Sequence, residues 1–398
     1  MRFEKTVLQV IPALDAGGAE RTTVEMTRAI VGAGGQALVA TAGGRLCEDV
    51  ERAGGRIVLM PVGSKNPLVV AANRGRLLRL AREEKVDIIH ARSRAPAWSA
   101  LWAARAAGIP FAATYHGAYN ARSPLKRFYN SAMARADLVI ANSAFTAASI
   151  RRFYDVGDRL RVIPRGADLA LFNPEAITAG RVSAVRAHWG LAEGGALTLL
   201  LPGRLTEWKG HQVAIEALAI LAGRSRNQSE TGATGDFQLI FTGDAQGRDD
   251  YAASLMRKVD ELGLQRMIRW VGHCDDMPAA YAACDIILSP STRPEAFGRV
   301  AVEAGAMARP VIAADHGGAR ETIIDEETGI LVTPGSAEAL ADAIAKTVAL
   351  GPSGRRAMSE KARARVVSHF SIEAMCASTL EAYRSLLDRS GAPASAAR

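Results

Sequence analysis

The sequence predicts an α/β protein of two tandem, doubly wound domains, each built on a parallel sheet. Three observations support this prediction. The 398 residues suit two domains at roughly 100–200 residues per domain. Short apolar runs alternate with amphipathic stretches of helical length, which is typical of βαβ units. The same series begins again after Asn173-Pro174. With 48% apolar and 23% charged residues, the composition excludes a disordered or fibrous chain.

Seven apolar runs in residues 1–172 are predicted to be strands. Continuous apolar runs are typical of parallel strands that are buried on both faces. Helical stretches such as residues 19–31 and 68–84 lie between them. The predicted strands are Val7–Ile11, Ala37–Ala40, Ile57–Leu59, Asp87–His90, Phe111–Thr114, Leu138–Ala141 and Arg161–Ile163. These residues form the predicted N-terminal domain.

Six further runs in residues 173–370 are predicted to form the C-terminal domain. They are Leu197–Leu201, Gln238–Thr242, Ile268–Val271, Ile286–Leu288, Val311–Ala313 and Ile330–Val332. Pro164–Pro174 is the predicted linker, and the polar segment Gly223–Asp236 is predicted to be a surface loop. The chain is expected to be helical from Pro352 to about Leu387, and the tail Gly391–Arg398 is expected to be frayed.

Cysteine usage and hydropathy indicate a cytoplasmic protein. The four cysteines include no CxxC pair, which suits a reducing compartment and gives no metal-ligand spacing. The longest apolar stretch, residues 95–115, is interrupted by Arg105, Gly108 and Pro110, so it does not predict a membrane span. The short apolar run near the N-terminus fits a first strand better than a signal peptide.

Positive charge is concentrated in the N-terminal domain. Residues 1–172 contain 25 Lys and Arg against 14 Asp and Glu, a net charge of +11, while the remaining residues have a net charge of −3. This excess favours an acidic partner: a membrane surface, a phosphorylated substrate or nucleic acid. A solvated, arginine-rich surface is the alternative. Nucleic acid is disfavoured because aromatic residues, at 6%, do not cluster with the basic ones.

Ligands of open α/β sheets bind beyond the carboxyl ends of the strands, so functional residues are expected in the loops there. After the first strand, Gly17-Gly18 lets backbone approach a ligand, and the following helix offers N–H groups to an anion. The fingerprint G-x-G-x-x-G is absent, which argues against a nicotinamide enzyme. A tight βα turn is the alternative interpretation.

Two cations follow the first strand of the second domain. Gly203-Arg204 and Lys209-Gly210 precede a helix, and together they could bind a diphosphate. Two solvated surface cations are the alternative.

Two glutamates stand eight residues apart after a later strand. Glu295 is placed in a loop and Glu303 in a helix that starts near Phe297. If all eight residues were helical, the two would be about 12 Å apart. A carboxylate accepts hydrogen bonds from adjacent hydroxyls of a sugar or ribose, and the amides of Phe297 and Gly298 would add donors. A solvated helix face is the alternative.

Polar residues also follow two strands of the first domain. His116 comes directly after Tyr115 at a strand end, where it could donate to a substrate hydroxyl or be purely structural. Arg92 and Arg94 follow another strand and are expected at the rim of the site.

In combination, these motifs resemble the retaining glycosyltransferases of family 4. Gly203-Arg204-Leu205, Lys209-Gly210 and the Glu295/Glu303 element carry the resemblance, and Gly17–Glu20 and Tyr115–Gly117 match its N-terminal signatures. It extends from residue 6 to about residue 385. It implies the GT-B fold: two Rossmann-like domains facing a cleft. The C-terminal helix would cross back, so that 371–398 completes the N-terminal, acceptor-binding domain and 173–370 binds the nucleotide-sugar.

The resemblance also implies roles for single residues. Arg204 and Lys209 would neutralise the diphosphate, Glu303 would hold the ribose, and Glu295 with the amides near Phe297 and Gly298 would hold the donor sugar. His116 would touch that sugar, and Gly17 and Gly18 would approach the phosphates. Glu20, Arg92, Arg94 and Tyr115 are expected on the acceptor side. One departure is Arg165, since many members have Asn at this position.

The implied function is retaining transfer of a hexosyl unit from a nucleotide-diphosphate sugar to a hydroxyl of a lipid-linked or polysaccharide acceptor. Lipopolysaccharide core, capsule and glycolipid synthesis are the expected settings. No metal or other cofactor is expected, because no Asp-x-Asp occurs. The basic domain is expected to bind the anionic inner face of the cytoplasmic membrane peripherally. A soluble-acceptor sugar synthase and a nucleotide-sugar epimerase are the alternatives.

Overall fold

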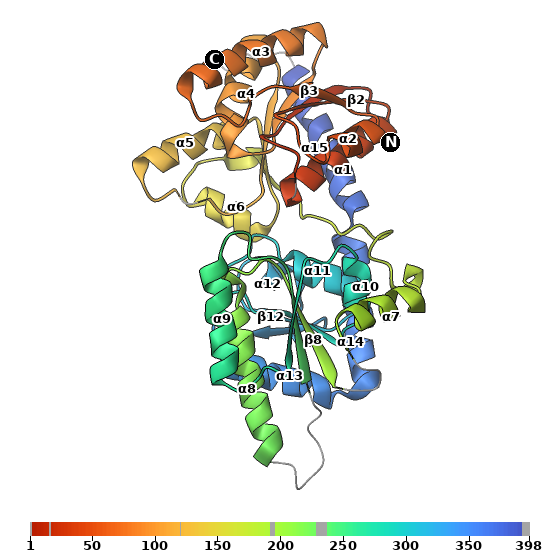
Figure 1. Cartoon of the computed structure of the whole chain (residues 1–398). Helices are drawn as coiled ribbons and strands as arrows, with labels where there is room; N and C mark the ends of the chain where they lie inside the picture. Colours follow the sequence, from red (N-terminus) through yellow and green to blue (C-terminus); the bar gives the residue numbers. More distant parts are fainter. Residues whose placement is uncertain (1, 16, 120, 192–195, 228–236, 392–398) are drawn as a thin grey trace. The chain divides into compact units, whose positions relative to one another are not determined.

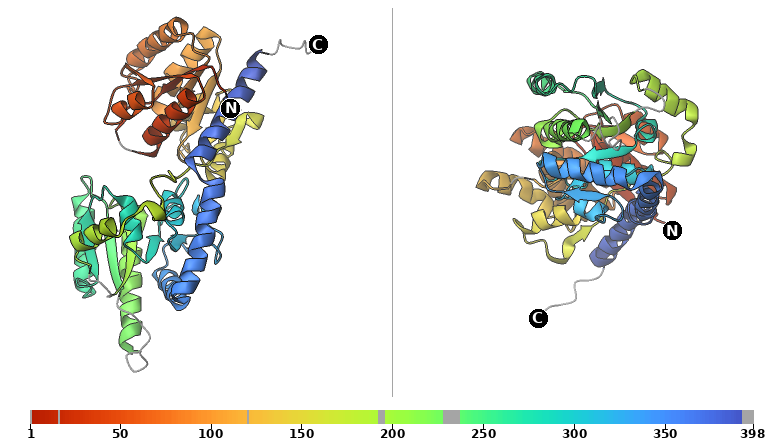
Figure 2. Two further views of the ribbon diagram at one scale, coloured as in Figure 1. Left: turned by 90° about the vertical axis from the view of Figure 1, so that its right-hand side faces the viewer. Right: turned by 90° about the horizontal axis from the view of Figure 1, so that it is seen from below.

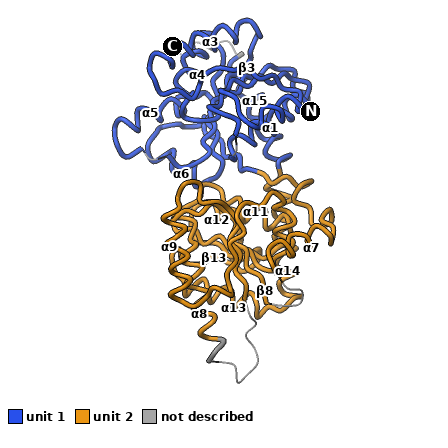
Figure 3. Tube along the Cα trace, viewed as in Figure 1, with its two compact units in different colours: residues 1–165, 372–398 blue, residues 166–371 orange. Residues whose placement is uncertain are grey.

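The computed structural model describes all residues except 1, 16, 120, 192–195, 228–236 and 392–398. The chain divides into two compact units, one formed by residues 1–165 and 372–398 and the other by residues 166–371 (Figure 3). The boundary predicted after residue 172 therefore lies within the second unit, a few residues beyond the division between the units.

Unit 1 contains a seven-stranded, all-parallel sheet with the strand order β3-β2-β1-β4-β5-β6-β7. The order reverses between β1 and β4, where the carboxyl ends of a doubly wound sheet open toward ligands. The strands are β1 (Thr6–Val10), β2 (Gln36–Thr41), β3 (Arg56–Leu59), β4 (Ile88–Ala91), β5 (Phe111–Tyr115), β6 (Leu138–Ala141) and β7 (Leu160–Val162).

Helices cover both faces of this sheet. On one face Leu77 of α3 and Trp98 of α4 join its core, and on the other Met26 of α1 packs with Tyr383 of α15. Figures 1 and 2 show α15, in dark blue, beside the red helix α1. The helices are α1 (Gly18–Gly32), α2 (Cys47–Arg52), α3 (Pro67–Glu83), α4 (Arg94–Ala107), α5 (Pro124–Ala134), α6 (Ala144–Arg151) and α15 (Ile372–Gly391).

Several helices begin at side-chain caps that are local in sequence. Asn66 accepts a hydrogen bond from the N–H of Leu68, and Ser123 accepts one from the N–H of Lys126. Both are followed by proline, whose fixed φ suits the first helical position. These caps set where α3 and α5 start.

Unit 2 contains a six-stranded parallel sheet with the order β10-β9-β8-β11-β12-β13. Its strands are β8 (Leu197–Pro202), β9 (Phe237–Thr242), β10 (Ile268–Gly272), β11 (Ile286–Ser289), β12 (Val311–Ala314) and β13 (Ile330–Val332). Its helices are α7 (Ala179–His188), α8 (His211–Asn227), α9 (Asp249–Glu261), α10 (Met277–Ala282), α11 (Arg299–Ala306), α12 (Ala319–Thr322), α13 (Ala337–Ala349) and α14 (Gly351–His369). The switch in strand order lies between β8 and β11.

The thirteen predicted strands are all present, and two local predictions need correction. The predicted loop Gly223–Asp236 begins too early, because α8 continues to Asn227; residues 228–236 lie outside the described part. The helical C-terminal stretch is interrupted at Phe370 and Ser371, so α14 belongs to unit 2 and α15 to unit 1. The frayed tail was predicted for Gly391–Arg398, and 392–398 lie outside the described residues.

Among the described residues, none of the helices combines the length and the apolar character that a membrane crossing requires.

Candidate functional site

Two loops at the carboxyl ends of β8 and β11 bring Lys209 and Glu295 into contact. Lys209 Nζ lies 2.9 Å from Glu295 Oε1, and the two side chains are only 14% and 16% exposed. Ser291 donates its hydroxyl to the same carboxylate oxygen at 2.5 Å. The Lys209 stem passes over Gly203, where an added Cβ would lie 3.4 Å from Lys209 Cε. A largely buried ion pair therefore lies at the carboxyl ends of β8 and β11. An anionic ligand would compete with Glu295 for Lys209.

Glu303 is anchored by two partners on either side of its carboxylate. Tyr281 donates its hydroxyl to Oε2 at 2.9 Å, and Arg299 donates from Nε and Nη2 to Oε1 at 3.1 and 2.6 Å. Burial, reinforced by the Glu303 charge, raises the pKa of Tyr281 well above its ordinary value, so this phenol stays protonated and donating. Oε1 already accepts two hydrogen bonds, whereas Oε2 accepts one and can accept a second, which leaves Glu303 able to receive a ligand hydroxyl.

The loop that carries Glu295 is pinned by the loop after β12. Gly318 donates its N–H to the Glu295 carbonyl at 2.9 Å, and His316 Nε2 lies 2.8 Å from the Ser291 carbonyl. A Cβ at Gly318 would lie 2.4 Å from backbone atoms of Phe297. Only glycine permits this close approach. The position of Glu295 is thus set by two loops that are distant in sequence.

The start of α11 differs from the prediction by two residues. Gly298 adopts the left-handed conformation with φ of 83° as the N-cap, so the helix begins at Arg299 and not near Phe297. The Phe297 side chain is buried and packs against Phe370 with 5.9 Å between ring centroids. Phe297 can therefore offer a ligand its backbone but not its ring.

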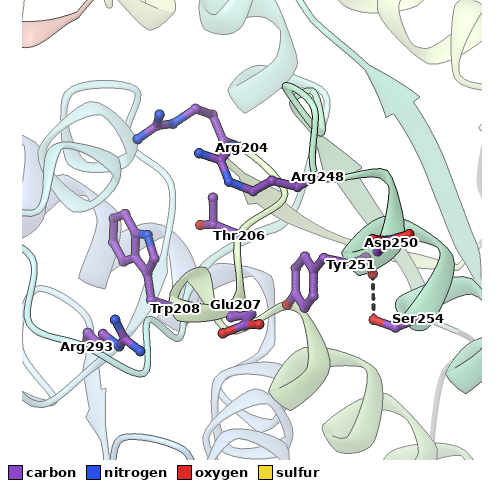
Figure 4. Close-up of a pocket in the computed structure, with 9 residues that line it drawn as sticks. All are labelled: Arg204, Thr206, Glu207, Trp208, Arg248, Asp250, Tyr251, Ser254 and Arg293. Atoms are coloured by element: carbon purple, nitrogen blue, oxygen red, sulfur yellow. Dashed lines mark hydrogen bonds between the residues drawn. The ribbon is translucent and has the colours of Figure 1, made fainter.

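Arg204 lines a pocket of about 560 Å³ on unit 2 (Figure 4). Figure 4 shows Arg204 and Arg248 among the side chains that line this pocket. Among the described residues, neither Arg204 nor Arg293 forms an ion pair. The lining residues are Arg204, Thr206, Glu207, Trp208, Arg248, Asp250, Tyr251, Ser254 and Arg293. Arg204 and Lys209, predicted as one phosphate pair, thus hold different positions here: Lys209 is paired with Glu295, and Arg204 faces this pocket.

Sequence reasoning missed Trp208, Arg248, Tyr251 and Arg293 as members of this pocket. Arg248 and Tyr251 follow β9, and Arg293 follows β11. The rule that ligands bind beyond the carboxyl ends of strands was the available signal. Which side chains of those loops converge could not be predicted from it.

In unit 1, His116 follows β5 and contacts Arg165. Nη2 of Arg165 lies 2.6 Å from His116 Nδ1. Because a guanidinium can only donate, Nδ1 must accept, and the ring proton resides on Nε2. Burial, followed by the Arg165 charge, lowers the pKa of His116 well below its ordinary value. The buried Nε2 has no hydrogen-bond partner among the described residues. His116 is therefore a neutral ring that presents an N–H donor.

The glycine turn before α1 is crowded by two charged side chains. A Cβ at Gly17 would lie 2.4 Å from Glu20 Oε2, and one at Gly18 would lie 2.1 Å from Arg165 Nη1. The Glu20 carboxylate thus curls back over the start of α1, where helix N–H groups attract an anion. Gly18, Glu20, His116 and Arg165 form one cluster in unit 1.

Two residues expected on the acceptor side are buried in unit 1. Arg92, expected at the rim, is 2% exposed and donates to Gln9 Oε1 at 2.8 Å and to the Thr22 carbonyl at 3.0 Å, so that expectation is wrong. Tyr115 is equally buried, and its side chain belongs to the hydrophobic core of unit 1. Arg94 is partly exposed and stacks over the Tyr119 ring at 4.1 Å. Of the three, only Arg94 could reach an acceptor directly.

Unit 2 thus offers carboxylates with spare acceptor capacity beside cations at a sheet switch point, and unit 1 offers a neutral histidine donor beside a glycine turn. This chemistry suits a ligand that carries both hydroxyls and phosphate.

Comparisons with known proteins identify similar proteins that are glycosyltransferases. A family model described as "Glycosyl transferases group 1" matches residues 187–365, and one described as "Glycosyltransferase Family 4" matches residues 16–171. A D-inositol 3-phosphate glycosyltransferase of Saccharomonospora viridis is 33% identical over 235 residues, which are 58% of this chain and 52% of that protein. The chain spans about half the length of the curated relatives it matches.

Solved structures match over nearly the whole chain. A glycosyltransferase from Rickettsia africae is 34% identical, with a TM-score of 0.87, over 96% of this chain and 99% of that one. Anabaena HepE in complex with UDP-glucose is 26% identical, with a TM-score of 0.78, over 96% of this chain and 99% of that one.

Proposed function

The chain belongs to the group 1 glycosyl transferases of glycosyltransferase family 4, and from this premise we propose that it transfers a hexosyl unit from a nucleotide-diphosphate sugar to an acceptor hydroxyl. The predicted family and its GT-B fold of two Rossmann-like units are confirmed. Two observations in unit 2 carry the proposal: the Lys209–Glu295 ion pair, and Glu303 held by Tyr281 and Arg299.

Binding of the nucleotide-sugar donor would replace the contact between Lys209 and Glu295 with contacts from each of them to the donor. A diphosphate that enters unit 2 would attract Lys209. Lys209 and Arg204 would then stabilise the negative charge that develops on the leaving β-phosphate. Glu295, held in place by Ser291, would then accept hydroxyls of the donor sugar. Glu303 would accept the ribose hydroxyls, and the amides of Phe297 and Gly298 would add donors. The UDP-glucose bound by Anabaena HepE supports a nucleotide-sugar of this class.

We also propose that the transfer needs no metal and that residues of unit 1 take part in it. In this proposal, Arg204 and Lys209 replace a divalent metal, and the reaction retains the anomeric configuration. His116 would donate from Nε2 to an oxygen of the donor sugar, which suits its neutral tautomer. Gly17 and Gly18 would bring backbone close to the phosphates, and Glu20 and Arg94 would meet the acceptor.

A lipid-linked or polysaccharide acceptor is proposed because of the charge of the N-terminal part. Residues 1–172 carry 25 Lys and Arg against 14 Asp and Glu, which favours an anionic membrane surface as partner. The proposed setting is lipopolysaccharide core, capsule or glycolipid synthesis at the inner face of the cytoplasmic membrane.

A soluble phosphorylated acceptor is the second candidate. The observation that favours it is the similarity to proteins named D-inositol 3-phosphate glycosyltransferase. Transfer to a water-soluble polyol phosphate in the absence of any lipid would select it. An epimerase would convert the donor without any acceptor.

The first test is a thermal-shift panel of nucleoside diphosphates and their sugars, measured with chelator present. One nucleotide series is expected to stabilise the chain by about 2.7 kcal/mol at a hundred times its Kd. Glu303→Gln should abolish this shift while keeping an oxygen for Arg299 and an amide N–H that the Tyr281 oxygen can accept. Alanine is unsuitable, because it leaves the buried Tyr281 hydroxyl unpaired.

Glu360→Gln is the matched control, since Glu360 also pairs with an arginine four residues away but is well exposed on α14. The control should respond to nucleotides like the unaltered chain. A panel that shows no shift for any nucleotide, both alone and with a lipid extract, contradicts the proposed function.

A further inference from the structure

The helix α5 exposes large apolar side chains in one place. Leu125 and Phe128, one turn apart, are 78% and 59% exposed, and Trp102 on the adjacent α4 is 42% exposed. Trp98 links the rings, because its centroid lies 5.0 Å from Phe128 and 5.3 Å from Trp102. Figure 1 shows α5, in tan, beside α4 in unit 1. Grouped apolar side chains of this kind mark a contact surface, whereas single ones do not.

The same region is basic and has no acidic residue in its sequence. Between Asp87 and Asp137 there are seven Lys and Arg and no Asp or Glu. Lys126, Arg127 and Arg135 are exposed, and within the described ranges none of them forms an ion pair with a carboxylate. The positive charge is therefore available to an external partner.

A groove of about 380 Å³ joins the charge to the apolar group. Arg122, Arg127 and Arg135 line it together with Phe128 and Tyr154, and none of its described lining residues is acidic. Arginine is suited to phosphate because its planar fork can donate two parallel hydrogen bonds. Phe128 lines the groove and is also part of the exposed group, so the phosphate-binding and apolar portions are continuous.

We propose that this α5 surface, defined as Trp102, Leu125, Phe128, Arg122, Arg127 and Arg135, docks on a bilayer of anionic phospholipid. The groove takes a headgroup phosphate, and the apolar side chains enter the headgroup–acyl boundary, as in interfacial helices. The charge pattern favours an anionic lipid surface, because the sequence between Asp87 and Asp137 contains only cationic charges and exposed Lys and Arg are attracted to anionic headgroups. The inference rests on the proposed function only for the lipid-borne acceptor that docking would bring within reach.

The experiment is co-sedimentation of the full chain with vesicles, in the absence of donor. The unaltered chain is expected to bind vesicles of phosphatidylcholine with phosphatidylglycerol, not vesicles of phosphatidylcholine alone. Binding should weaken between about 0.1 and 0.5 M salt, because the attraction is screened. Leu125→Asp/Phe128→Asp and Arg127→Glu/Arg135→Glu should each reduce the partition coefficient by at least about tenfold. Two separate double variants keep the test valid if one fails to fold by circular dichroism.

Met256→Asp/Arg257→Glu on α9 is the matched control, because it changes an exposed apolar residue beside an exposed cation in unit 2. It should bind vesicles normally. Equal binding to both kinds of vesicle, or unchanged binding by both α5 variants, overturns the proposal. Displacement from vesicles by millimolar inorganic phosphate would assign the groove to free phosphate, and a dimer dispersed by Leu125→Asp/Phe128→Asp without vesicle binding would assign the surface to self-association. Either result also overturns it.

The inference and the proposed function can fail separately. Intact nucleotide stabilisation with no vesicle binding rejects the docking surface alone. Vesicle binding with no response in the nucleotide panel rejects the transferase proposal alone.

Discussion

At the scale of single residues, the Arg165–His116 pair is the most informative contact in unit 1. Arg165 donates a hydrogen bond to His116 at 2.6 Å, and its guanidinium leaves no room for a side chain at Gly18. The family resemblance implies asparagine at this position. Arg165 therefore selects the tautomer of His116 and, after burial, helps to lower the pKa of the ring, so we expect it to act as a positioning residue.

The first residue-scale prediction concerns Arg165→Asn. Asparagine is shorter and carries no charge, so the substitution removes the Nη2 donor and the cation that, after burial, lowers the pKa of His116. The acid limb of the activity profile should therefore move to higher pH by about one pH unit. Nitrogen-15 NMR of the His116 ring at neutral pH should report protonated Nε2 in the unaltered chain and a mixture of tautomers in Arg165→Asn. Arg45→Asn, an exposed arginine of the same unit, should leave the profile unchanged. A profile that is identical in all three chains contradicts the positioning role.

At the scale of elements, the candidate donor site is a set of loops that glycines hold together. An added Cβ would lie 2.0 Å from the Pro290 carbonyl oxygen at Gly210, and 2.3 Å from the Glu295 carbonyl oxygen at Gly317. Both glycines have φ in the left-handed region, at 81° and 60°. The loops after β8, β11 and β12 are thus packed backbone against backbone, and this packing positions Lys209 beside Glu295.

Gly210→Ala tests this packing. The substitution combines the cost of a positive φ with a backbone clash, so it should destabilise the chain by roughly 2 kcal/mol or more and weaken nucleotide binding. Gly263→Ala is the control: its φ is 66°, but an added Cβ meets nothing within 4 Å. Thermal melts and nucleotide titrations of both variants separate the two effects. Equal losses in stability and in affinity would show that loop packing does not matter.

At the scale of the whole molecule, both ends of the chain build unit 1. The Tyr383 hydroxyl of α15 lies 2.5 Å from His90 Nδ1, and His90 Nε2 lies 2.8 Å from Thr114 Oγ1. Burial lowers the pKa of His90 well below its ordinary value. In unit 2, burial lowers the pKa of His211 to about 4. The folded chain therefore keeps buried histidines neutral in both units.

These histidines predict loss of stability in acid. Their pKa values are lower when folded, so between about pH 6.5 and the folded pKa the unfolded chain binds protons that the folded chain does not. Stability is complete above pH 6.5 and decreases below it. His211 alone should contribute a loss of about 2 kcal/mol between pH 7.5 and pH 5. Urea unfolding across this range measures it. His211→Phe should flatten the dependence, whereas His188→Gln, at an exposed site, should not. A free energy of unfolding that stays constant to pH 5 contradicts this account.

The sequence by itself determined the strands, their alternation with helices, and the loops that carry the candidate ligand-binding residues. These features are local: a buried parallel strand requires a short apolar run, and a turn requires residues such as Gly17, Gly203 and Gly298 within a few positions of it. The family signatures are local too. For this reason all thirteen strands and the loops of Glu295 and Lys209 could be predicted.

Only the tertiary structure decided which side chains meet. Lys209 and Glu295 are 86 residues apart in sequence, and Arg165 and His116 are 49 apart. Arg92 was expected at the rim, but it points inward because Gln9, on the adjacent strand, offers it a buried acceptor. Whether a charge after a strand is solvated, paired or buried depends on neighbours that the sheet order supplies. Local sequence carries no record of that order, and this is the physical reason why contacts had to come from the fold.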